Sequence, residues 1–286
     1  MSESTNIFVS SHGILKSCDW YNSQPSLDTL RSYSYPPVLY VSNNKIRSFR
    51  VETLPQIDFS FVLVSGDCDE TVPYDIFSSE EELRLFLNHS FLLHWFCQNL
   101  VLDHNKMTRM PIGLDYHTMT TKTIWGNLIS SYDQEICLQS IKQSSRPFWD
   151  RQHTAYGNFH FLTTTRYGYD RKDAIQNLNS SLVFYEPTRI TRENTWKRQI
   201  DYAFVISPHG NGYDCHRLWE ALVLGCIPIV KTSPIDSLYD GLPVLIVKQW
   251  SDVTQILLDT TIEQFRHKSF QYEKLTLSFW MDKIRS

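Results

Sequence analysis

The sequence predicts an α/β protein of two Rossmann-like domains, and three observations support this. Short apolar runs alternate with segments of helical periodicity, a pattern typical of a parallel sheet with helices on both faces. The length of 286 residues suffices for two modest domains. A Pro- and Gly-bearing segment at residues 110–117 and a polar, irregular stretch at 118–150 separate the two halves. We therefore expect a cleft between the domains, where a ligand would bind.

Each expected strand is a short apolar run bounded by turn residues. Such runs occupy residues 38–41, 59–64, 159–162, 182–185, 202–206, 227–230 and 244–247. Helical periodicity occupies residues 79–87, 91–100, 171–178, 215–224 and 251–265, and a last helical pattern covers 262–284. These elements predict a first domain at 1–117, a linker or peripheral segment at 118–150, a second domain at 151–260 and a C-terminal helix at 261–286.

Composition and charge argue against several classes of function. The formal net charge of −4 and the pI of about 6.2 provide no basic field for nucleic acid. No apolar run approaches the ~18–20 residues of a membrane span, and the start of the chain lacks the basic and apolar regions of a signal peptide. The six cysteines form no C-x-x-C pair, which favours a reduced setting without a zinc site. We therefore expect a cytoplasmic protein that binds neither nucleic acid nor a membrane.

The most informative segment is residues 204–230, FVISPHGNGYDCHRLWEALVLGCIPIV. A strand-like run leads into the loop 207–214, and a helical pattern follows until Gly225 ends it. Free backbone N–H groups and the helix dipole then point at the loop, which favours an anion site there. The loop residues that we expect at a phosphate-bearing donor are Ser207, Gly210, Asn211, Gly212 and Asp214.

The helix after this loop carries Arg217 and Glu220, three residues apart and so on one face. A cation in the first turn opposes the helix dipole, and an anion beside it would explain its presence. Glu220 could accept hydrogen bonds from ribose hydroxyls, so the pair predicts a nucleotide site. The alternative is an exposed ion pair, with glycines that serve only a tight turn. Cys215 stands where a dinucleotide loop needs its third glycine, and no G-x-x-x-x-G-K-[ST] motif occurs.

The same segment resembles a signature of exostosin-like glycosyltransferases, an R-x-x-E-A-x-x-x-G-C-x-P-V type of pattern in their donor-binding domain. The matching string is Arg217-Leu-Trp-Glu220-Ala221-Leu-Val-Leu-Gly225-Cys226-Ile-Pro228-Ile-Val. The resemblance covers residues 202–250. In it the chain is similar to short, soluble versions of such enzymes in bacteria and large DNA viruses. The membrane anchor of animal exostosins is not expected here.

This resemblance implies a GT-B-like fold, in which the second domain binds the donor and the first domain binds the acceptor. In such enzymes a C-terminal helix often crosses back onto the first domain. The resemblance also implies that Glu220 binds the donor ribose, while the loop and basic residues hold the diphosphate. The implied co-substrate is a nucleoside-diphosphate sugar, most simply UDP-linked, with UDP-xylose as the first candidate. The implied acceptor is a hydroxyl of a glycan or glycoprotein, and no metal or other cofactor is required.

Other cations are candidates to join Arg217 at the diphosphate, because a leaving diphosphate needs positive groups around it. Arg166 follows a strand-like run, and Arg171 begins a helical pattern, which makes Arg171 the stronger candidate. Lys231 follows a strand end and is a weaker one. Each of these residues could equally be a solvated surface cation.

An acceptor hydroxyl should lose its proton to a positioned base. The segment 61–70 places carboxylates just past a buried strand, where α/β sheets hold ligands. Asp69 is the first candidate and Asp67 the second, and the alternative is a turn with solvated acids. His12 and His94 could also act as the base, although a structural role explains each of them as well.

Asp67-Cys-Asp69 also matches the D-x-D pattern of metal-dependent glycosyltransferases, a short pattern that is common by chance. Because the stronger signature lies in the second half, we expect no metal. The sequence therefore predicts an inverting, metal-independent glycosyltransferase that moves a hexose or pentose, with xylosyl transfer as the first candidate. A nucleotide-sugar epimerase would instead turn over without an acceptor. A non-catalytic nucleotide- or glycan-binding module would bind UDP and transfer nothing.

Overall fold

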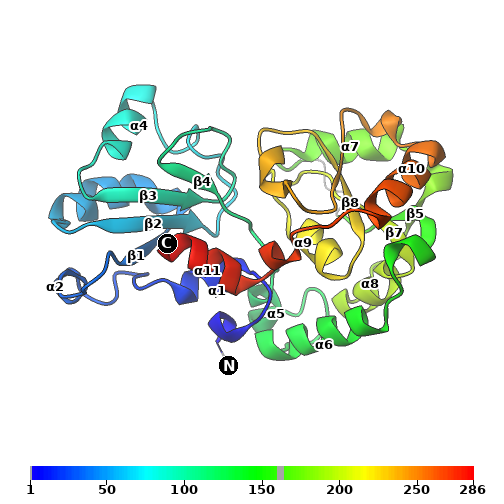
Figure 1. Cartoon of the computed structure of the whole chain (residues 1–286), viewed down its shortest axis with the longest axis horizontal. Helices are drawn as coiled ribbons and strands as arrows, with labels where there is room; N and C mark the ends of the chain where they lie inside the picture. Colours follow the sequence, from blue (N-terminus) through cyan, green and yellow to red (C-terminus); the bar gives the residue numbers. More distant parts are fainter. Residues whose placement is uncertain (1, 160–163) are drawn as a thin grey trace.

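The computed structural model describes residues 2–159 and 164–286, which form two α/β lobes joined by the middle of the chain (Figure 1). Within these residues each lobe is built on a parallel sheet, one of four strands and the other of five. A cavity opens between the lobes and is described below. The expected fold class, a GT-B-like pair of Rossmann-like domains with a cleft between them, is confirmed.

The first lobe has strands in the order β1-β2-β3-β4, all parallel. Their bounds are Val38–Ser42, Phe61–Gly66, Leu92–Cys97 and Met107–Arg109. The helices of this lobe are α1 (Ser11–Ser17), α2 (Leu27–Arg31), α3 (Ile46–Ser48) and α4 (Glu80–Leu87). The prediction of a helix over residues 91–100 is wrong, because this segment contains the buried strand β3. A short apolar run fits either structure, and the pairing of β3 with β2 and β4 decides between them.

The second lobe has the parallel strand order β6-β5-β7-β8-β9. The strands are β5 (Gln152–Gly157), β6 (Val183–Tyr185), β7 (Tyr202–Ile206), β8 (Ile227–Lys231) and β9 (Leu245–Val247). The helices are α7 (Gly168–Asn177), α8 (Arg192–Gln199), α9 (His216–Val223) and α10 (Gln255–Arg266). The chain passes from β5 to β6 on one side and then returns to place β7, β8 and β9 on the other side of β5. The order of strands therefore switches between β5 and β7, the place where such sheets open a crevice for a ligand.

Most elements predicted in this half are confirmed, and the exceptions have a common cause. The sequence analysis did not predict β5 or α8, because both are too polar to show a clear apolar period. The strand expected at 159–162 falls largely on residues outside the described part of the chain, and Phe159 itself lies in no strand.

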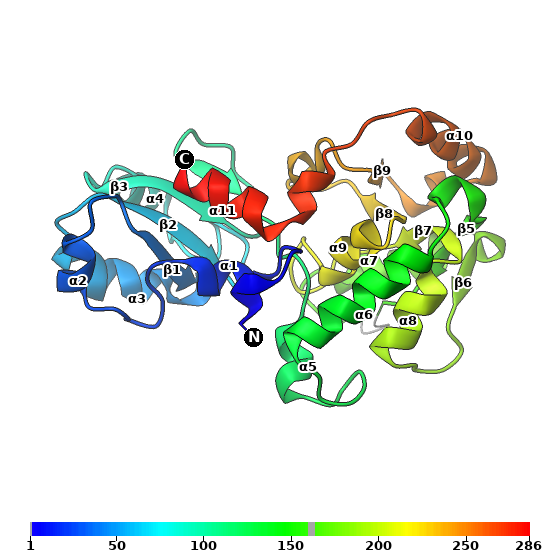
Figure 2. The same ribbon diagram turned by 60° about the horizontal axis from the view of Figure 1, so that its bottom comes forward.

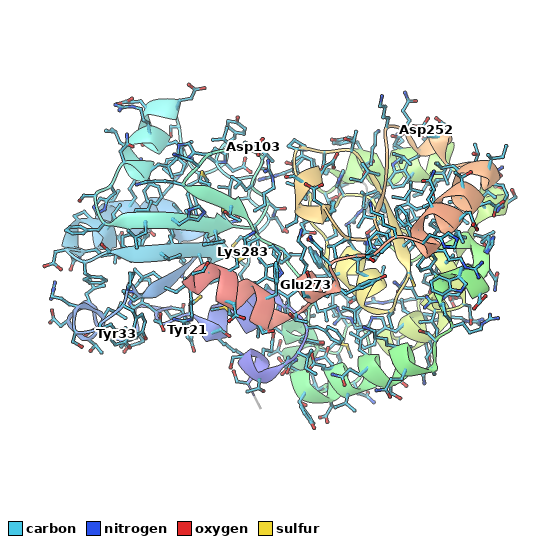
Figure 3. All side chains as sticks on the ribbon, viewed as in Figure 1. Tyr21, Tyr33, Asp103, Asp252, Glu273 and Lys283 are labelled. Atoms are coloured by element: carbon cyan, nitrogen blue, oxygen red, sulfur yellow. The ribbon has the colours of Figure 1, made fainter. Side chains whose placement is uncertain are left out.

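The middle and the end of the chain tie the lobes together. Helices α5 (His117–Thr121) and α6 (Ser131–Ser144) lie along the second lobe, where α6 contacts α8 (Figure 2). Helix α11 (Leu277–Arg285) ends the chain on the first lobe, packed against α1. Figure 3 labels Glu273 between the lobes and Lys283 on α11. An ion pair between Arg285 and Asp19 at 3.0 Å joins the chain's last helix to the first lobe.

One hydrophobic cluster continues from the first lobe into the second, with Val64 and Phe96 at one end and Trp219 and Val230 at the other. The lobes therefore share core packing, which limits their independent movement. The helical pattern expected over 262–284 is interrupted between α10 and α11, and the domain bounds expected from the sequence stay predictions. No helix in the described part of the chain is both long and apolar enough to span a membrane.

Candidate active site

A cavity of about 560 Å³ lies between the lobes, lined mainly by the second lobe. The first half of the chain contributes Asp69, Ile112 and Trp125 to its wall. The residues predicted from the sequence that line this cavity are Asp69, Arg171, Asn211, Gly212, Asp214, Arg217 and Glu220. Those that do not line it are Asp67, Arg166, Ser207 and Gly210. The volume falls in the usual range of small-molecule sites, about 300–1,000 Å³.

The loop 207–214 is fixed by side chains that leave room only for glycine at two positions. A Cβ at Gly210 would lie 2.4 Å from Nη2 of Arg171, and one at Gly212 would lie 2.8 Å from Nδ2 of Asn99. Ser207 is buried behind the loop, and no hydrogen bond to its hydroxyl is found within the described residues. The glycines therefore serve the close approach of an arginine and an asparagine to the loop backbone.

Asp170 fixes the backbone of this loop at His209. Its carboxylate accepts a hydrogen bond from the backbone N–H of His209 at 2.9 Å and another from Nε1 of Trp250 at 2.8 Å. Burial alone would raise the pKa of Asp170, but these donors and the His209 ring, 3.0 Å away, lower it below its usual value. Asp170 thereby positions α7, the helix that carries Arg171.

Arg171 and Arg217 provide the positive charge of the cavity. Nε of Arg171 donates to the carbonyl oxygen of His209 at 3.2 Å, and the side chain is 8% exposed. Arg217 lies in the first turn of α9. Among the described residues, its guanidinium makes long contacts to the carbonyl oxygens of Asn158 (3.4 Å) and Pro208 (3.5 Å) and lies 5.7 Å from the ring centre of Phe159. Burial and the neighbouring Arg171 both lower the pKa of Arg217, although Cys215 and Glu220 oppose them.

Within residues 2–159 and 164–286, no carboxylate forms an ion pair with Arg217. The helix N-terminus and the neighbouring guanidinium of Arg171 both disfavour the charge of Arg217. An anionic ligand beside Arg217 would offset both effects, because Arg217 and the first N–H groups of α9 would then have a counter-charge.

Glu220 lies one turn further along α9 and is held by Arg192, a residue that the sequence analysis missed. Nε and Nη2 of Arg192 both contact Oε1 of Glu220, at 3.0 and 2.8 Å. The guanidinium of Arg192 also lies 4.7 Å from the ring centre of Trp125 and donates to the carbonyl oxygen of Asp115. Oε2 of Glu220 accepts no hydrogen bond from the described residues, so it can accept one from a ligand hydroxyl. Arg192 is another cation in the first turn of a helix, which is the signal that could have revealed it.

Asp214 has a structural task at the base of α9. Its carboxylate accepts from the backbone N–H groups of Ile112 (2.7 Å) and Cys215 (3.0 Å) and from Nε1 of Trp219 (2.9 Å). Burial raises the pKa of Asp214 to about 6, despite these donors. Because Ile112 belongs to the segment that joins the lobes, Asp214 ties α9 to that segment, and its oxygens are already used within the protein.

Asp69 faces the second lobe across the cavity. Partial burial and the nearby Glu70 raise its pKa, while His216, a hydrogen bond with Asn211 and Arg166 oppose the rise. The residue is nonetheless exposed to solvent. A carboxylate with a raised pKa at a cavity wall is suited to accept a proton from a bound hydroxyl.

His216 is a second residue that the sequence analysis did not consider. It begins α9 and lines the cavity, and its Nδ1 lies 2.7 Å from the carbonyl oxygen of Gly113. Because a carbonyl oxygen only accepts, Nδ1 carries the proton. When the ring is neutral, Nε2 is then an acceptor.

Asp67 turns away from the cavity toward His12, whose Nε2 lies 3.1 Å from its Oδ1. Burial opposes protonation of His12, but Asp67 outweighs this effect and the pKa of His12 is raised. The ring of His12 stacks on that of His117 at 4.0 Å, and burial lowers the pKa of His117 to about 4. The ligand atoms of His12, Asp67 and His117 lie within 4.8 Å of one another, so this group could hold a metal ion.

The ring geometry does not favour such a metal site. The two imidazoles are inclined by only 18°, so their lone pairs lie in nearly parallel planes and do not converge on one ion. Asp69 does not belong to this group; it lines the cavity, whereas Asp67 contacts His12. The expectation of metal-independent chemistry stays a prediction.

The remaining predicted residues have partners outside the cavity. Arg166 forms an ion pair with Asp75, and Lys231 pairs with Asp173 at 2.5 Å. Nε2 of His94 lies 2.8 Å from the hydroxyl of Thr108, away from the cavity wall. These contacts make Arg166 and Lys231 parts of surface ion pairs in this state of the chain.

Comparison with known proteins gives only distant likenesses. No family model matches the chain, and no curated protein matches it. The solved structures that resemble it include an α1,3-fucosyltransferase (13% identity, TM-score 0.41), an α1,3-fucosyltransferase with GDP-fucose (13%, 0.42) and an α1,3-fucosyltransferase with GDP (14%, 0.40). They cover 95–97% of this chain and 95–96% of their own. At this distance they support no inference about activity, and the exostosin-like resemblance of residues 202–250 stays a prediction.

Proposed function

We propose that this protein is a glycosyltransferase that moves a sugar from a nucleoside-diphosphate sugar to a hydroxyl of a glycan or glycoprotein. The observation that carries the proposal is the arrangement along α9. Arg217 lines the cavity without an ion-pair partner among the described residues, and Glu220 follows one turn later with Oε2 available. A diphosphate and its ribose match this pair in charge and spacing.

In this reaction the acceptor hydroxyl attacks the anomeric carbon as the bond to the diphosphate breaks. The proton of the hydroxyl passes to Asp69, and the leaving diphosphate keeps the electron pair of the broken bond. Arg171, Arg217 and the N-terminus of α9 offset the charge that develops on the diphosphate. Attack from the face opposite to the leaving group would invert the anomeric carbon.

The proposal is tested by calorimetry with nucleoside diphosphates, nucleosides and nucleotide sugars, including UDP-xylose, the donor favoured by the sequence resemblance. We expect Arg217→Ala to weaken binding of a nucleoside diphosphate far more than binding of its nucleoside, because only the former carries phosphates. Arg84→Ala, an exposed arginine of α4 paired with Glu81, is the matched control and should change neither. An equal loss for both ligands would reject the phosphate role of Arg217.

Transfer itself is measured as release of the nucleoside diphosphate with and without glycan acceptors. Release that depends on an acceptor supports a glycosyltransferase. Conversion of the sugar in the absence of an acceptor would instead indicate an epimerase-type enzyme. Binding without any turnover would indicate a non-catalytic module.

A further inference from the structure

Helix α8 buries its polar side chains against the cavity. Arg192, Thr195 and Gln199 lie on one face of the helix, at spacings of three and four residues. They are 8%, 7% and 1% exposed, and all three line the cavity. Outside this stripe, the side chains of Lys197 and Arg198 are 55% and 61% exposed. A helix that buries a polar stripe needs polar partners for it, either in the protein or in a ligand.

Only part of this stripe is satisfied within the protein. Arg192 is engaged by Glu220, and Oγ1 of Thr195 accepts a hydrogen bond from Nδ2 of Asn158 at 3.0 Å. Nε2 of Gln199 has no hydrogen-bond partner in the part of the chain that the structure describes. A buried amide donor without a partner costs free energy, and a carbonyl oxygen of a ligand would satisfy it.

Glu186 lines the cavity directly after strand β6, and Arg198, the residue before Gln199 on α8, approaches its carboxylate. Its side chain is 10% exposed, and its Oε1 accepts a hydrogen bond from the hydroxyl of Tyr156 at 3.1 Å. Nε of Arg198 lies 3.8 Å from the same oxygen. The contacts found among the described residues all reach Oε1, which leaves Oε2 and the second lone pair of Oε1 for a ligand.

The order of these groups follows the parts of a nucleotide. Arg171 and Arg217 mark the diphosphate, and Glu220 marks the ribose. Arg192 contacts Glu220, and α8 leads away from it for seven residues to Gln199, about 10 Å at 1.5 Å per residue. Gln199 therefore lies beyond the ribose, where the nucleobase would be, and the contact of Glu186 with Arg198 links Glu186 to the same end of α8.

A carboxylate beside an amide donor distinguishes among the four bases. Guanine presents two adjacent donors, the ring N1–H and the 2-amino group, and next to them the acceptor O6. Uracil presents a single N–H between two carbonyl oxygens, which a carboxylate would repel. Adenine and cytosine each present one amino donor beside an acceptor ring nitrogen, so a carboxylate accepts one hydrogen bond from them where guanine gives it two.

We propose that the cavity binds a guanine nucleotide, with the Glu186 carboxylate accepting from N1–H and the 2-amino group and the Gln199 amide donating to O6. This inference rests on the proposed function and specifies its donor as a GDP sugar. It replaces the UDP sugar expected from the sequence.

The test compares GDP, IDP, UDP and ADP by calorimetry on the whole chain. IDP differs from GDP only by the missing 2-amino group, so it isolates one hydrogen bond to a charged acceptor. We expect IDP to bind about 10- to 100-fold more weakly than GDP, the usual effect of such a bond, and UDP and ADP to bind more weakly still.

Glu186→Gln should lower GDP affinity about 10- to 100-fold and bring the GDP-to-IDP ratio close to one, because the amide no longer offers two acceptors. Glu193→Gln, on the exposed face of α8 and paired with Lys197, is the matched control and should bind GDP as the wild type does. The GDP and IDP comparison on the wild type needs no variant to fold.

Each other outcome has a distinct meaning. Binding of UDP that equals or exceeds binding of GDP would overturn the guanine assignment and leave the proposed function standing. Equal binding of GDP and IDP by the wild type, or an unchanged ratio in Glu186→Gln, would remove Glu186 from the base site. Binding of none of the four nucleotides would reject both the inference and the nucleotide-sugar function.

Discussion

The ion pair between Arg192 and Glu220 lies on the side of α9 that lines the cavity, and its contribution to stability can be tested directly. Both side chains are largely buried, with exposed fractions of 8% and 11%. We choose Arg192→Met, because methionine keeps most of the volume that packs on Trp125 and Trp196 and removes only the charge and its hydrogen bonds. The variant leaves the Glu220 carboxylate buried without its cation.

Removing one partner of a buried pair costs about 3–5 kcal/mol, since the remaining charge stays desolvated without compensation. We therefore expect Arg192→Met to lower the free energy of unfolding in urea by about this amount. Glu220→Gln in the same chain should restore part of the loss, because it neutralises the orphaned charge. Lys197→Ala, which removes an exposed pair on the outer face of α8, should change stability little.

The measurement is a set of urea denaturation curves, followed by tryptophan fluorescence and circular dichroism, for the wild type, both single variants, the double variant and the control. The reasoning is refuted if Arg192→Met is as stable as the control. It is equally refuted if the double variant is no more stable than Arg192→Met, because the loss would then not come from an unpaired Glu220.

Three further predictions concern the base, the metal and pH. Asp69→Asn should lower kcat by about 10²–10⁴-fold, the usual contribution of a general base, with donor affinity nearly unchanged; Asp67→Asn should have a smaller effect, and near-normal transfer by Asp69→Asn would end its candidacy. Transfer should persist in excess chelator, whereas loss of activity that Mn²⁺ or Mg²⁺ restores would revive the D-x-D metal site. Because the pKa of Asp214 is raised to about 6 in the folded chain, the folded state binds its proton more tightly than the unfolded state does, and stability falls as pH rises from about 4 to about 6. The wild type should lose up to about 3 kcal/mol relative to Asp214→Asn over this interval, and parallel stability curves of the two proteins would contradict the assignment.

Local sequence patterns were enough to predict the two-lobed α/β fold and several of the residues that line the cavity. The unit of β7, loop and α9 can be predicted from neighbouring residues alone, because strand, glycine loop and helix follow one another without a break. The same segment placed Arg217 and Glu220 on one helix face, and the structure brings both to the cavity with Asp69 and Arg171. The prediction failed at β3 and missed β5 and α8. A short apolar run does not distinguish a buried helix from a buried strand, and polar segments lack an apolar period.

What only the tertiary structure decided is the set of partners that each charged side chain meets. Asp67 and Asp69 are two residues apart, yet one turns to His12 and the other to the cavity. The sequence predicted Asp214 to bind the donor, but in the structure its buried carboxylate accepts from the backbone N–H groups of Ile112, in the joining segment, and of Cys215, before α9. Arg192 and Glu186 reach the cavity from parts of the chain with no motif. A sequence shows which groups can accept or donate, whereas burial and the approach of distant segments decide which bonds they make.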